Sequence, residues 1–218
     1  MRQNRQRPHS LKLIAMNCRS DLTRAQITRM VLGMTVLVDT REQNTDRARR
    51  RLDALEHPIE RATLDYGDYA YNCTFPDGSC LLDLSGRVFP PCVIERKMNL
   101  DELAQCLCRG RDRFCAEFER AKEHGADIWL LVENGSMEGI MRSSYRTKIA
   151  PAAFLGSVLA LQRRYGVHLV FCSEYSTPTI IRSILRADLR ELLEKGWFND
   201  VDTGMDKALS EHSRIKRI

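Results

Sequence analysis

A short apolar run, Val93-Ile94, leads directly into the charged triplet Glu95-Arg96-Lys97. Side chains of a strand alternate between its two faces, so Glu95 and Lys97 point one way and Arg96 points the other. Taken alone, such a pair is common as solvated charge at the end of an exposed strand. Here it predicts a strand whose end holds a carboxylate and an amine side by side, and the rest of the fold must be built around that strand.

Two upstream segments also place carboxylates where apolar runs end or begin. Residues 36–39 are an apolar run that ends in Asp39, with Glu42 three residues later, and Asp68 follows Gly67 in a turn before a further strand at 69–74. Mg2+ takes carboxylate and water ligands, and a nearby lysine can orient an attacking water. Three such segments together predict metal-dependent phosphodiester chemistry. The competing interpretation is a solvated strand-end charge at each position, or a turn-forming role for Asp68.

The order Val-Asp-x-Arg-Glu at 38–42, Gly-Asp-Tyr at 67–69 and Glu-Arg-Lys-x3-Asp at 95–101 resembles the XPF-type, structure-specific endonuclease domain of the PD-(D/E)xK nuclease superfamily. The resemblance covers about residues 35–195. It implies an α/β fold: a restriction-endonuclease-like mixed β-sheet flanked by helices on both faces, which the alternation of predicted strands and helices also favours.

The same resemblance implies a Mg2+-dependent DNA endonuclease, with Mn2+ able to substitute. Such an enzyme hydrolyses phosphodiester bonds near branched, flapped or junction DNA in repair or recombination. Two alternatives stay open from the sequence. One is a non-cleaving DNA-binding or scaffolding relative, and the other is a nuclease that acts on unbranched DNA.

Five residues match the catalytic positions of that family: Asp39, Glu42, Asp68, Glu95 and Lys97. The resemblance implies that Asp68 and Glu95 are metal ligands, with Asp39 as a further ligand. Asp39 and Glu42 are expected to serve a second ion or a water network. Lys97 is expected to orient or deprotonate the attacking water and to contact the phosphate.

Three more residues match family positions in supporting roles: Arg41, Arg96 and Asp101. By strand alternation the two arginines face away from the acids, so they are expected to secure acidic side chains through salt bridges. Asp101 matches the last acid of the motif, yet it also suits the first turn of a helix, where a negative charge is favourable. Both roles stay open for Asp101.

Charge is unevenly distributed along the 218 residues. Of 34 Lys and Arg, seven lie in residues 1–33, and of 29 Asp and Glu only one does, so the rest of the chain holds 27 basic and 28 acidic residues. A DNA partner must therefore be argued from local clusters. The predicted nucleic-acid-binding residues are Arg109, Arg111, Arg113, Arg146 and Lys148. The arginines at 47 and 49–51 are further candidates, and the absence of a Gly-x4-Gly-Lys loop argues against nucleotide binding.

The sequence predicts three segments. Residues 1–33 are expected to form a basic, partly disordered N-terminal extension, either an accessory arm or the product of an over-long start. Residues 34–196 are expected to form the XPF-type nuclease domain, with a hairpin insertion at about 75–91, and residues 197–218 a charged C-terminal tail. With eight cysteines but no Cys-x2-Cys pair, and no signal peptide or membrane-length apolar run, we expect a reduced compartment, cytoplasmic (nucleoid-associated) or nuclear.

A homodimer, or pairing with a related subunit, is expected through about residues 152–195. Apolar residues surround much of the first predicted helix there and form a wide stripe on the second. The alternative is that both helices simply cover the sheet.

Overall fold

The computed structural model describes residues 22–195, which build a seven-stranded sheet in the order β4-β2-β1-β3-β5-β6-β7. The strands are β1 (Thr35–Asp39), β2 (Ile59–Leu64), β3 (Tyr69–Asn72), β4 (Arg87–Val88), β5 (Cys92–Lys97), β6 (Asp127–Glu133) and β7 (His168–Cys172). β3 runs antiparallel to its neighbours β1 and β5, and every other neighbouring pair is parallel. The predicted mixed sheet is confirmed.

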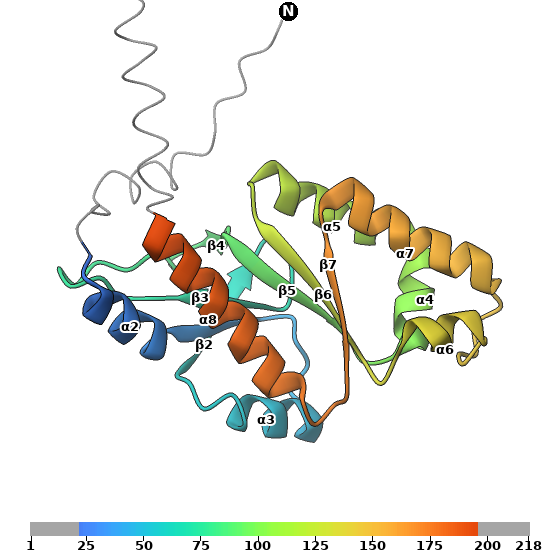
Figure 1. Cartoon of the computed structure of the whole chain (residues 1–218), viewed down its shortest axis with the longest axis horizontal. Coiled ribbons are helices and arrows are strands. Elements are labelled where there is room, and N and C mark those ends of the chain that lie inside the picture. The colour runs from blue at the N-terminus through green and yellow to red at the C-terminus, as the bar shows by residue number, and fades with distance from the viewer. Residues whose placement is uncertain (1–21, 196–218) are drawn as a thin grey trace, which may run out of the picture.

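Helices cover both faces of this sheet (Figure 1). On one side lie α2 (Arg24–Leu32), α3 (Asp46–Asp53) and α8 (Thr177–Lys195), and on the other lie α4 (Leu100–Cys108), α5 (Arg111–Glu123), α6 (Met137–Met141) and α7 (Pro151–Tyr165). Each side has its own apolar cluster. Ile94 packs into the α8 side and Val93 into the α5 side, so β5 is buried on both faces, as its apolar run predicts.

Two side-chain caps fix where helices begin after the strands of interest. Thr45 Oγ1 accepts a hydrogen bond from Ala48 N at 3.1 Å at the start of α3. Asn99 Oδ1 accepts one from Glu102 N at 2.9 Å at the start of α4. Such caps satisfy backbone N–H groups that a helix leaves unpaired. Both helices therefore begin at a side-chain cap.

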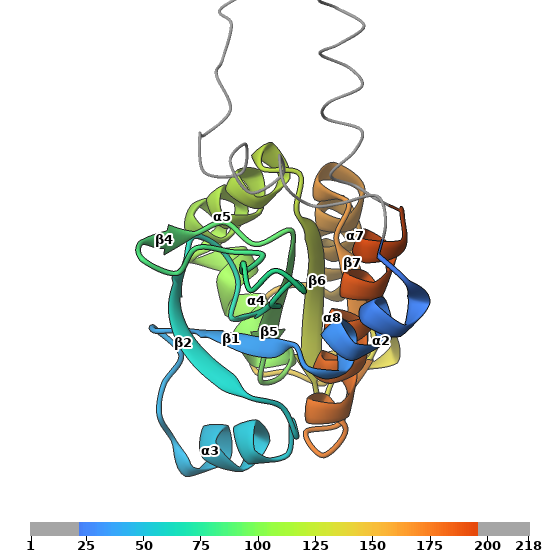
Figure 2. The same cartoon turned by 90° about the vertical axis from the view of Figure 1, so that its left-hand side faces the viewer.

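The first described helix, α2, is part of the domain. Ile27, Met30 and Val31 are buried in the α8-side cluster, and α2 lies beside α8 (Figure 2). Thr23 and Gln26 form a reciprocal capping box at its start. The predicted boundary between residues 33 and 34 is therefore wrong, because it separates α2 from the core into which it packs. Residues 1–21 lie outside the described part.

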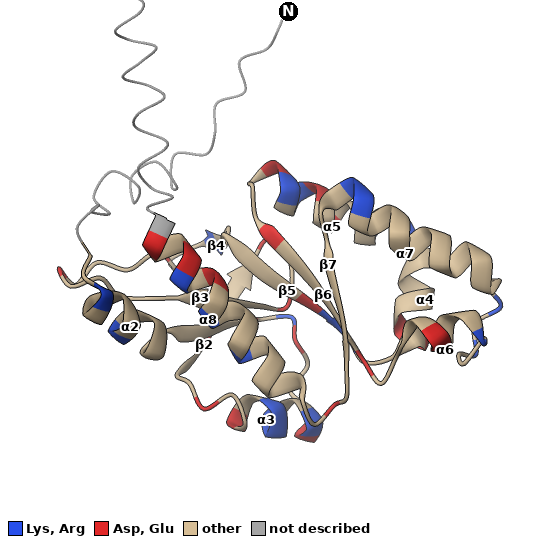
Figure 3. Ribbon diagram, viewed as in Figure 1, with Lys and Arg blue, Asp and Glu red and all other residues tan. Residues whose placement is uncertain are grey.

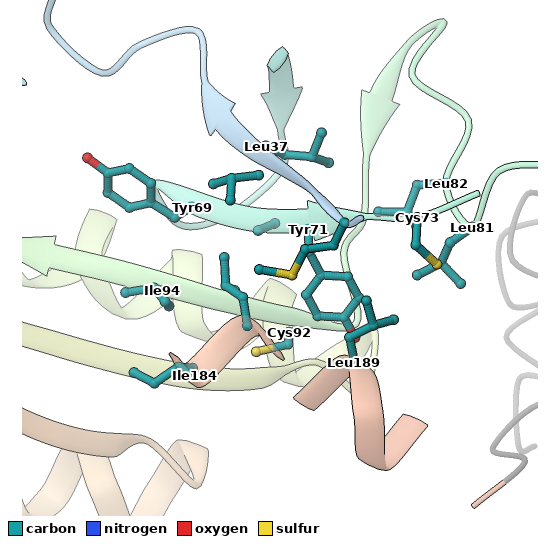
Figure 4. Packing of buried hydrophobic residues seen from close by; sticks show 14 of the residues in the cluster. Leu37, Tyr69, Tyr71, Cys73, Leu81, Leu82, Cys92, Ile94, Ile184 and Leu189 are labelled. Atoms are coloured by element: carbon teal, nitrogen blue, oxygen red, sulfur yellow. The ribbon is translucent and has the colours of Figure 1, made fainter. Parts of the chain in front are cut away.

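The predicted hairpin insertion at about 75–91 is also corrected. Only an isolated bridge joins Thr74 to Cys80, and β4 pairs parallel to β2 at the edge of the sheet. Leu81 and Leu82 are buried beside Cys73 in the α8-side cluster (Figure 4). The segment therefore covers the core and extends the sheet edge. The predicted tail at 197–218 lies outside the described residues.

The apolar stripe of α8 is buried by other parts of the same chain. Its members are buried against the sheet and α2: Ile181, Ile184, Leu185, Leu189, Leu192 and Leu193. The inference that this stripe exceeds what one core requires is therefore wrong for α8. On α7, Phe154 and Val158 are buried but Leu159 is 50% exposed, and Figure 3 shows most of this helix without charge. None of the helices within residues 22–195 has the length and apolar character needed to cross a membrane.

Candidate active site

The ends of β1 and β5 and the start of the antiparallel β3 lie together at one end of the sheet. Asp39 N donates to Asp68 O, and Asp68 N donates to Ile94 O, each at 2.9 Å. The turn before Asp68 requires glycine: Gly67 has φ +72°, and a Cβ there would lie 1.9 Å from Val93 Cγ2. This close approach brings Asp68 against the end of β5.

Glu95 and Lys97 share the α5-side face of β5, as strand alternation predicts. Lys97 Nζ donates to Glu95 Oε1 at 2.5 Å, and the side chains of Lys97 and Glu95 are 10% and 7% exposed. Lys97 Nζ also lies 5.1 Å from the centre of the Phe114 ring of α5. Asp68 Oδ2 accepts a hydrogen bond from Arg96 N at 2.8 Å, which ties this carboxylate to the same strand.

The electrostatics of this group leave negative charge unbalanced. Burial raises the pKa of Glu95 to about 8, and the charge of Asp68 adds to the rise. Burial also raises the pKa of Asp68 to about 6, although Lys97 opposes the change. The Lys97 ammonium loses solvation, but Glu95 and Asp68 outweigh that loss and raise its pKa. Two carboxylates thus face one ammonium, and a divalent cation, which favours oxygen ligands, fits such a pair.

Asp39, the third expected ligand, is bonded to Arg41 and to the end of β2 in this structure. Its side chain is 1% exposed, and Oδ1 accepts from both the backbone N and the Nε of Arg41 at 2.7 Å. Oδ2 accepts from Leu64 N at 3.0 Å and from Arg41 Nη2 at 3.1 Å. Within residues 22–195 no three His, Cys, Asp or Glu side chains gather closely enough to hold a metal ion. In this structure Asp39 holds Arg41, and its expected role as a metal ligand stays a prediction.

Glu42 contacts Arg96, whose side chain points away from Glu95 and Lys97. Its Oε1 accepts from Arg51 Nη2 at 2.7 Å and from the Tyr69 hydroxyl at 3.2 Å. Figure 4 shows the Tyr69 hydroxyl pointing away from the apolar cluster. Arg96 Nη2 lies 3.4 Å from the same Glu42 oxygen. Glu42 is therefore engaged by two arginines in this structure, and its expected role at a second ion or in a water network stays a prediction.

Arg96 faces away from Glu95 and Lys97, as predicted, and enters what we call the ion network: Glu42, Arg47, Arg51, Arg96, Glu133 and Glu174. At its centre the fully buried Glu133 accepts from Arg47 Nη2 at 2.7 Å and from Arg96 Nη1 at 3.2 Å. Arg51 is only 5% exposed. The expectation that Arg47 and Arg51 contact phosphates is wrong, because both point inward.

Asp101 is engaged at the start of α4. Its carboxylate accepts from Arg146 N at 2.5 Å and from Arg146 Nε at 3.0 Å, so it holds the loop between α6 and α7. Arg146 remains 88% exposed, and Lys148 is exposed two residues later. Figure 3 shows acidic and basic segments side by side where β5 ends.

The other predicted DNA-contacting residues lie at the junction of α4 and α5. Arg109, Arg111 and Arg113 are exposed around Gly110, and Arg111 Nη1 donates to Ser157 Oγ of α7 at 3.3 Å. Phe114, the residue after Arg113, contacts Lys97. The three arginines therefore flank the Glu95–Lys97 face.

The sequence interpretation missed two acids. Glu117 of α5 accepts from Gly67 N at 2.9 Å and adds to the raised pKa of Glu95. It sits between Phe114 and Phe118 on the apolar stripe of α5, and an acid in such a stripe is a usable signal. Glu133 ends the apolar strand β6, as Asp39 ends β1. The pattern that singled out Asp39 also fits Glu133.

Comparison with known proteins follows this geometry. The model of the ERCC4 domain family matches residues 38–179. XPF from Aeropyrum pernix has 23% sequence identity and a TM-score of 0.50, over 71% of this chain and 61% of that one. The structure of XPF from Aeropyrum pernix in complex with DNA has 22% sequence identity and a TM-score of 0.50, over 71% of this chain and 64% of that one. The chain thus spans somewhat less than two thirds of these XPF chains, and no curated protein matches it. Because the family model matches more than half of its length, the chain belongs to the ERCC4 domain family and carries an XPF-type nuclease domain.

Proposed function

We propose that this chain is a Mg2+-dependent DNA endonuclease that hydrolyses phosphodiester bonds. One observation carries the proposal: Asp68, Glu95 and Lys97 meet at the end of β5 with two carboxylates against one ammonium, in a setting that raises the pKa of both acids. The same three residues occupy the family motif. A site of this kind is short of one positive charge, which a cation and a phosphate substrate together can accommodate.

The chain's own residues have distinct tasks in this proposal. Asp68 and Glu95 would hold the ion, and Lys97 would position the attacking water and contact a phosphate oxygen. The chemistry that a divalent cation supplies is polarisation of the scissile phosphate and a nucleophile available at neutral pH. Glu117, through its hydrogen bond to Gly67 N, would keep the turn that carries Asp68 in place.

DNA as the substrate is supported by the family and by the exposed arginines beside the site. The structure of XPF from Aeropyrum pernix in complex with DNA is a precedent for such a substrate. We further propose that branched, flapped or junction DNA in repair or recombination is the target. Arg109, Arg111, Arg113, Arg146 and Lys148 are the proposed contacts to the sugar–phosphate backbone, since all five are exposed.

The decisive experiment compares Asp68→Asn and Glu95→Gln with the wild type. Each variant should lose Mg2+-dependent cleavage by at least about 10^3-fold, because a ligand is removed, while binding DNA with similar affinity. Glu123→Gln, an exposed change on α5, is the matched control and should cleave normally. Flap, fork, four-way-junction and linear duplex substrates should be assayed in parallel. Full activity of either variant would refute the site, and equal rates on all four substrates would refute the branched-DNA preference.

We also propose that two subunits pair through α7. Leu159 is half-exposed on a helix face that carries alanines and Gly156, and a Cβ at Gly156 would meet nothing within 4 Å. Leu159→Glu should convert a dimer to a monomer in light scattering. A wild-type protein that stays monomeric at high concentration would remove this proposal and leave the cleavage proposal standing.

A further inference from the structure

Two arginines outside the family motif share one buried carboxylate close to the site. Asp65 is 3% exposed; its Oδ1 accepts from Arg87 Nη1 of β4 at 2.8 Å, and its Oδ2 accepts from Arg120 Nε of α5 at 3.0 Å. Arg120 also donates from Nη2 to Asp65 O at 3.0 Å and from Nη1 to Ala116 O at 3.1 Å. Figure 2 shows β4 beside α5, so one aspartate joins the sheet edge to the helix.

A third arginine continues this line toward the site. Arg41 Nη2 donates to Leu64 O at 3.1 Å, at the residue directly before Asp65, while its Nε is held by Asp39. Asp65 itself precedes Asp68 by three residues in the chain. The three guanidinium groups are therefore anchored along the segment that runs from the end of β2 to the proposed metal ligand.

The two aspartates that anchor these arginines are buried, whereas the arginine side chains are substantially exposed. Asp39 and Asp65 are 1% and 3% exposed, whereas Arg41, Arg87 and Arg120 are 53%, 65% and 41% exposed. Glu117, at 18% exposure, lies 4.0 Å from Arg41 and is the nearest partly exposed acid with a recorded contact to these arginines. The surface therefore presents anchored guanidinium groups with free outward N–H donors, notably on Arg87, which uses only Nη1.

We propose that Arg41, Arg87 and Arg120, the arginine flank, bind consecutive phosphates of one DNA strand as it leaves the site past β4. This inference rests on the proposed function and names the surface that aligns its substrate. Guanidinium groups match phosphate oxygens in two-pronged geometry, and anchoring lowers the conformational entropy lost on binding. Three arginines in a row suit the consecutive phosphates of a DNA strand. A single anion would instead need donors that converge on one point.

The first test is DNA binding by fluorescence anisotropy in Ca2+, with a flap substrate. Arg87→Ala leaves the Asp65–Arg120 pair intact and should weaken binding several-fold, and it should reduce the slope of log K against log salt by about 0.7 to 0.9. Arg190→Ala on α8 is the matched control, since Arg190 is 40% exposed and pairs with Glu194. Unchanged affinity and slope in Arg87→Ala, with wild-type binding intact, would overturn the inference.

The second test separates anchoring from simple attraction. Asp65→Asn removes a negative charge, so attraction alone would tighten DNA binding, whereas loss of the shared anchor should weaken it. The melting temperature of each variant identifies any loss of fold. Should Asp65→Asn fail to fold, Arg120→Lys replaces it: the charge stays, the three anchoring hydrogen bonds cannot all form, and binding should still weaken. Tighter or unchanged binding in the folded variant would contradict the inference.

The third test locates the contacts on the DNA. Substrates that carry a neutral methylphosphonate at one position at a time should lose affinity at the phosphates next to the scissile one. At those positions Arg87→Ala should cause no further loss. Additive losses at every position would overturn the inference while wild-type cleavage would still support the nuclease. Wild-type protein that neither binds nor cleaves DNA would instead refute the proposed function, and this inference with it.

Discussion

The two faces of β5 at its C-terminal end both carry charged groups, but these groups are paired differently on each face. On the α8 side, Arg96 belongs to the ion network, in which three arginines meet three glutamates and the central Glu133 is fully buried. On the α5 side, Lys97 faces both Glu95 and Asp68. One face is balanced within the protein and the other is not. Alternate residues of one strand thus divide into a scaffold and a site.

The difference indicates how a charged strand end can be both stable and reactive. Buried charges are tolerated when partners of opposite sign surround them. The ion network meets that condition and holds the backbone of Arg96, whose N–H binds Asp68. The unbalanced face keeps raised carboxylate pKa values, the usual mark of a functional position rather than a structural one.

The largest effect on stability should come from removing the charge of Glu133, at the centre of the ion network. Glu133→Gln leaves Arg47, Arg51 and Arg96 without their central carboxylate and should lower the free energy of unfolding by about 4 kcal/mol in urea denaturation. Glu95→Gln, on the other face, should leave stability unchanged or raise it, since burial already disfavours that carboxylate at neutral pH. Equal losses in both variants would remove the distinction between the faces.

A slightly smaller effect is expected at the turn that builds the unbalanced face. Gly67→Ala combines a left-handed backbone with a Cβ placed 1.9 Å from Val93 Cγ2, and should cost about 3 kcal/mol of unfolding free energy. Gly78→Ala is the control: φ is +86° but nothing lies within 4 Å, so only about 1 kcal/mol should be lost. Similar losses at both glycines would mean that the close approach of the turn to β5 does not matter.

Asp188 is a further buried carboxylate. It lies outside the candidate active site, and no cation is among the main causes of its pKa shift. Burial raises the pKa of Asp188 to about 6, although the Tyr71 hydroxyl, 2.6 Å away, opposes the rise. Because this folded-state pKa exceeds the usual value of 3.8, protonated Asp188 adds stability that is complete below about pH 4 and is lost as pH rises through 6. Asp188→Asn should remove a decline of about 2 kcal/mol between pH 4 and 7, measured by chemical denaturation. An unchanged pH profile would show that burial alone does not shift a carboxylate here.

The smallest effect is expected at an exposed ion pair near the same sheet edge. Arg146→Ala removes the Arg146 Nε contact to Asp101 but keeps the hydrogen bond from the backbone N of residue 146. Exposed ion pairs contribute little, so the denaturation midpoint should not change measurably. A clear shift would mean that the number of ion pairs, rather than their burial, distinguishes the regions of this edge.

Much of the fold is predictable because local signals and tertiary packing agree. The buried strands read as apolar runs, Gly67 marks the turn, and Thr45 and Asn99, two residue types that favour the N-cap position, cap helices. The placement of Glu95 and Lys97 on one face follows from the period of a strand. Segments 22–33 and 75–91 were misassigned because their burial depends on α8 and on β2, and no local pattern specifies those contacts.

The roles of the acids were harder to predict than their positions. Asp39 and Glu42 match the motif, but the arginines that occupy them come from their own loop, from α3 and from β5. Which side chain a guanidinium reaches is decided by packing in three dimensions. The shared hold of Asp65 on Arg87 and Arg120 likewise joins residues 22 and 55 positions away, which a linear motif does not record.

The contact between α2 and α8 has a consequence for synthesis on the ribosome. The apolar surface of α2 and of strands β1 to β3 stays uncovered until the last described helix, α8, packs against it. The α5-side cluster contains only residues 66–171, so it can close earlier. During translation the nascent chain therefore exposes Met34, Tyr71 and their neighbours until the segment that contains Leu189 leaves the exit tunnel. A chain stalled before α8 should be a preferred client of chaperones.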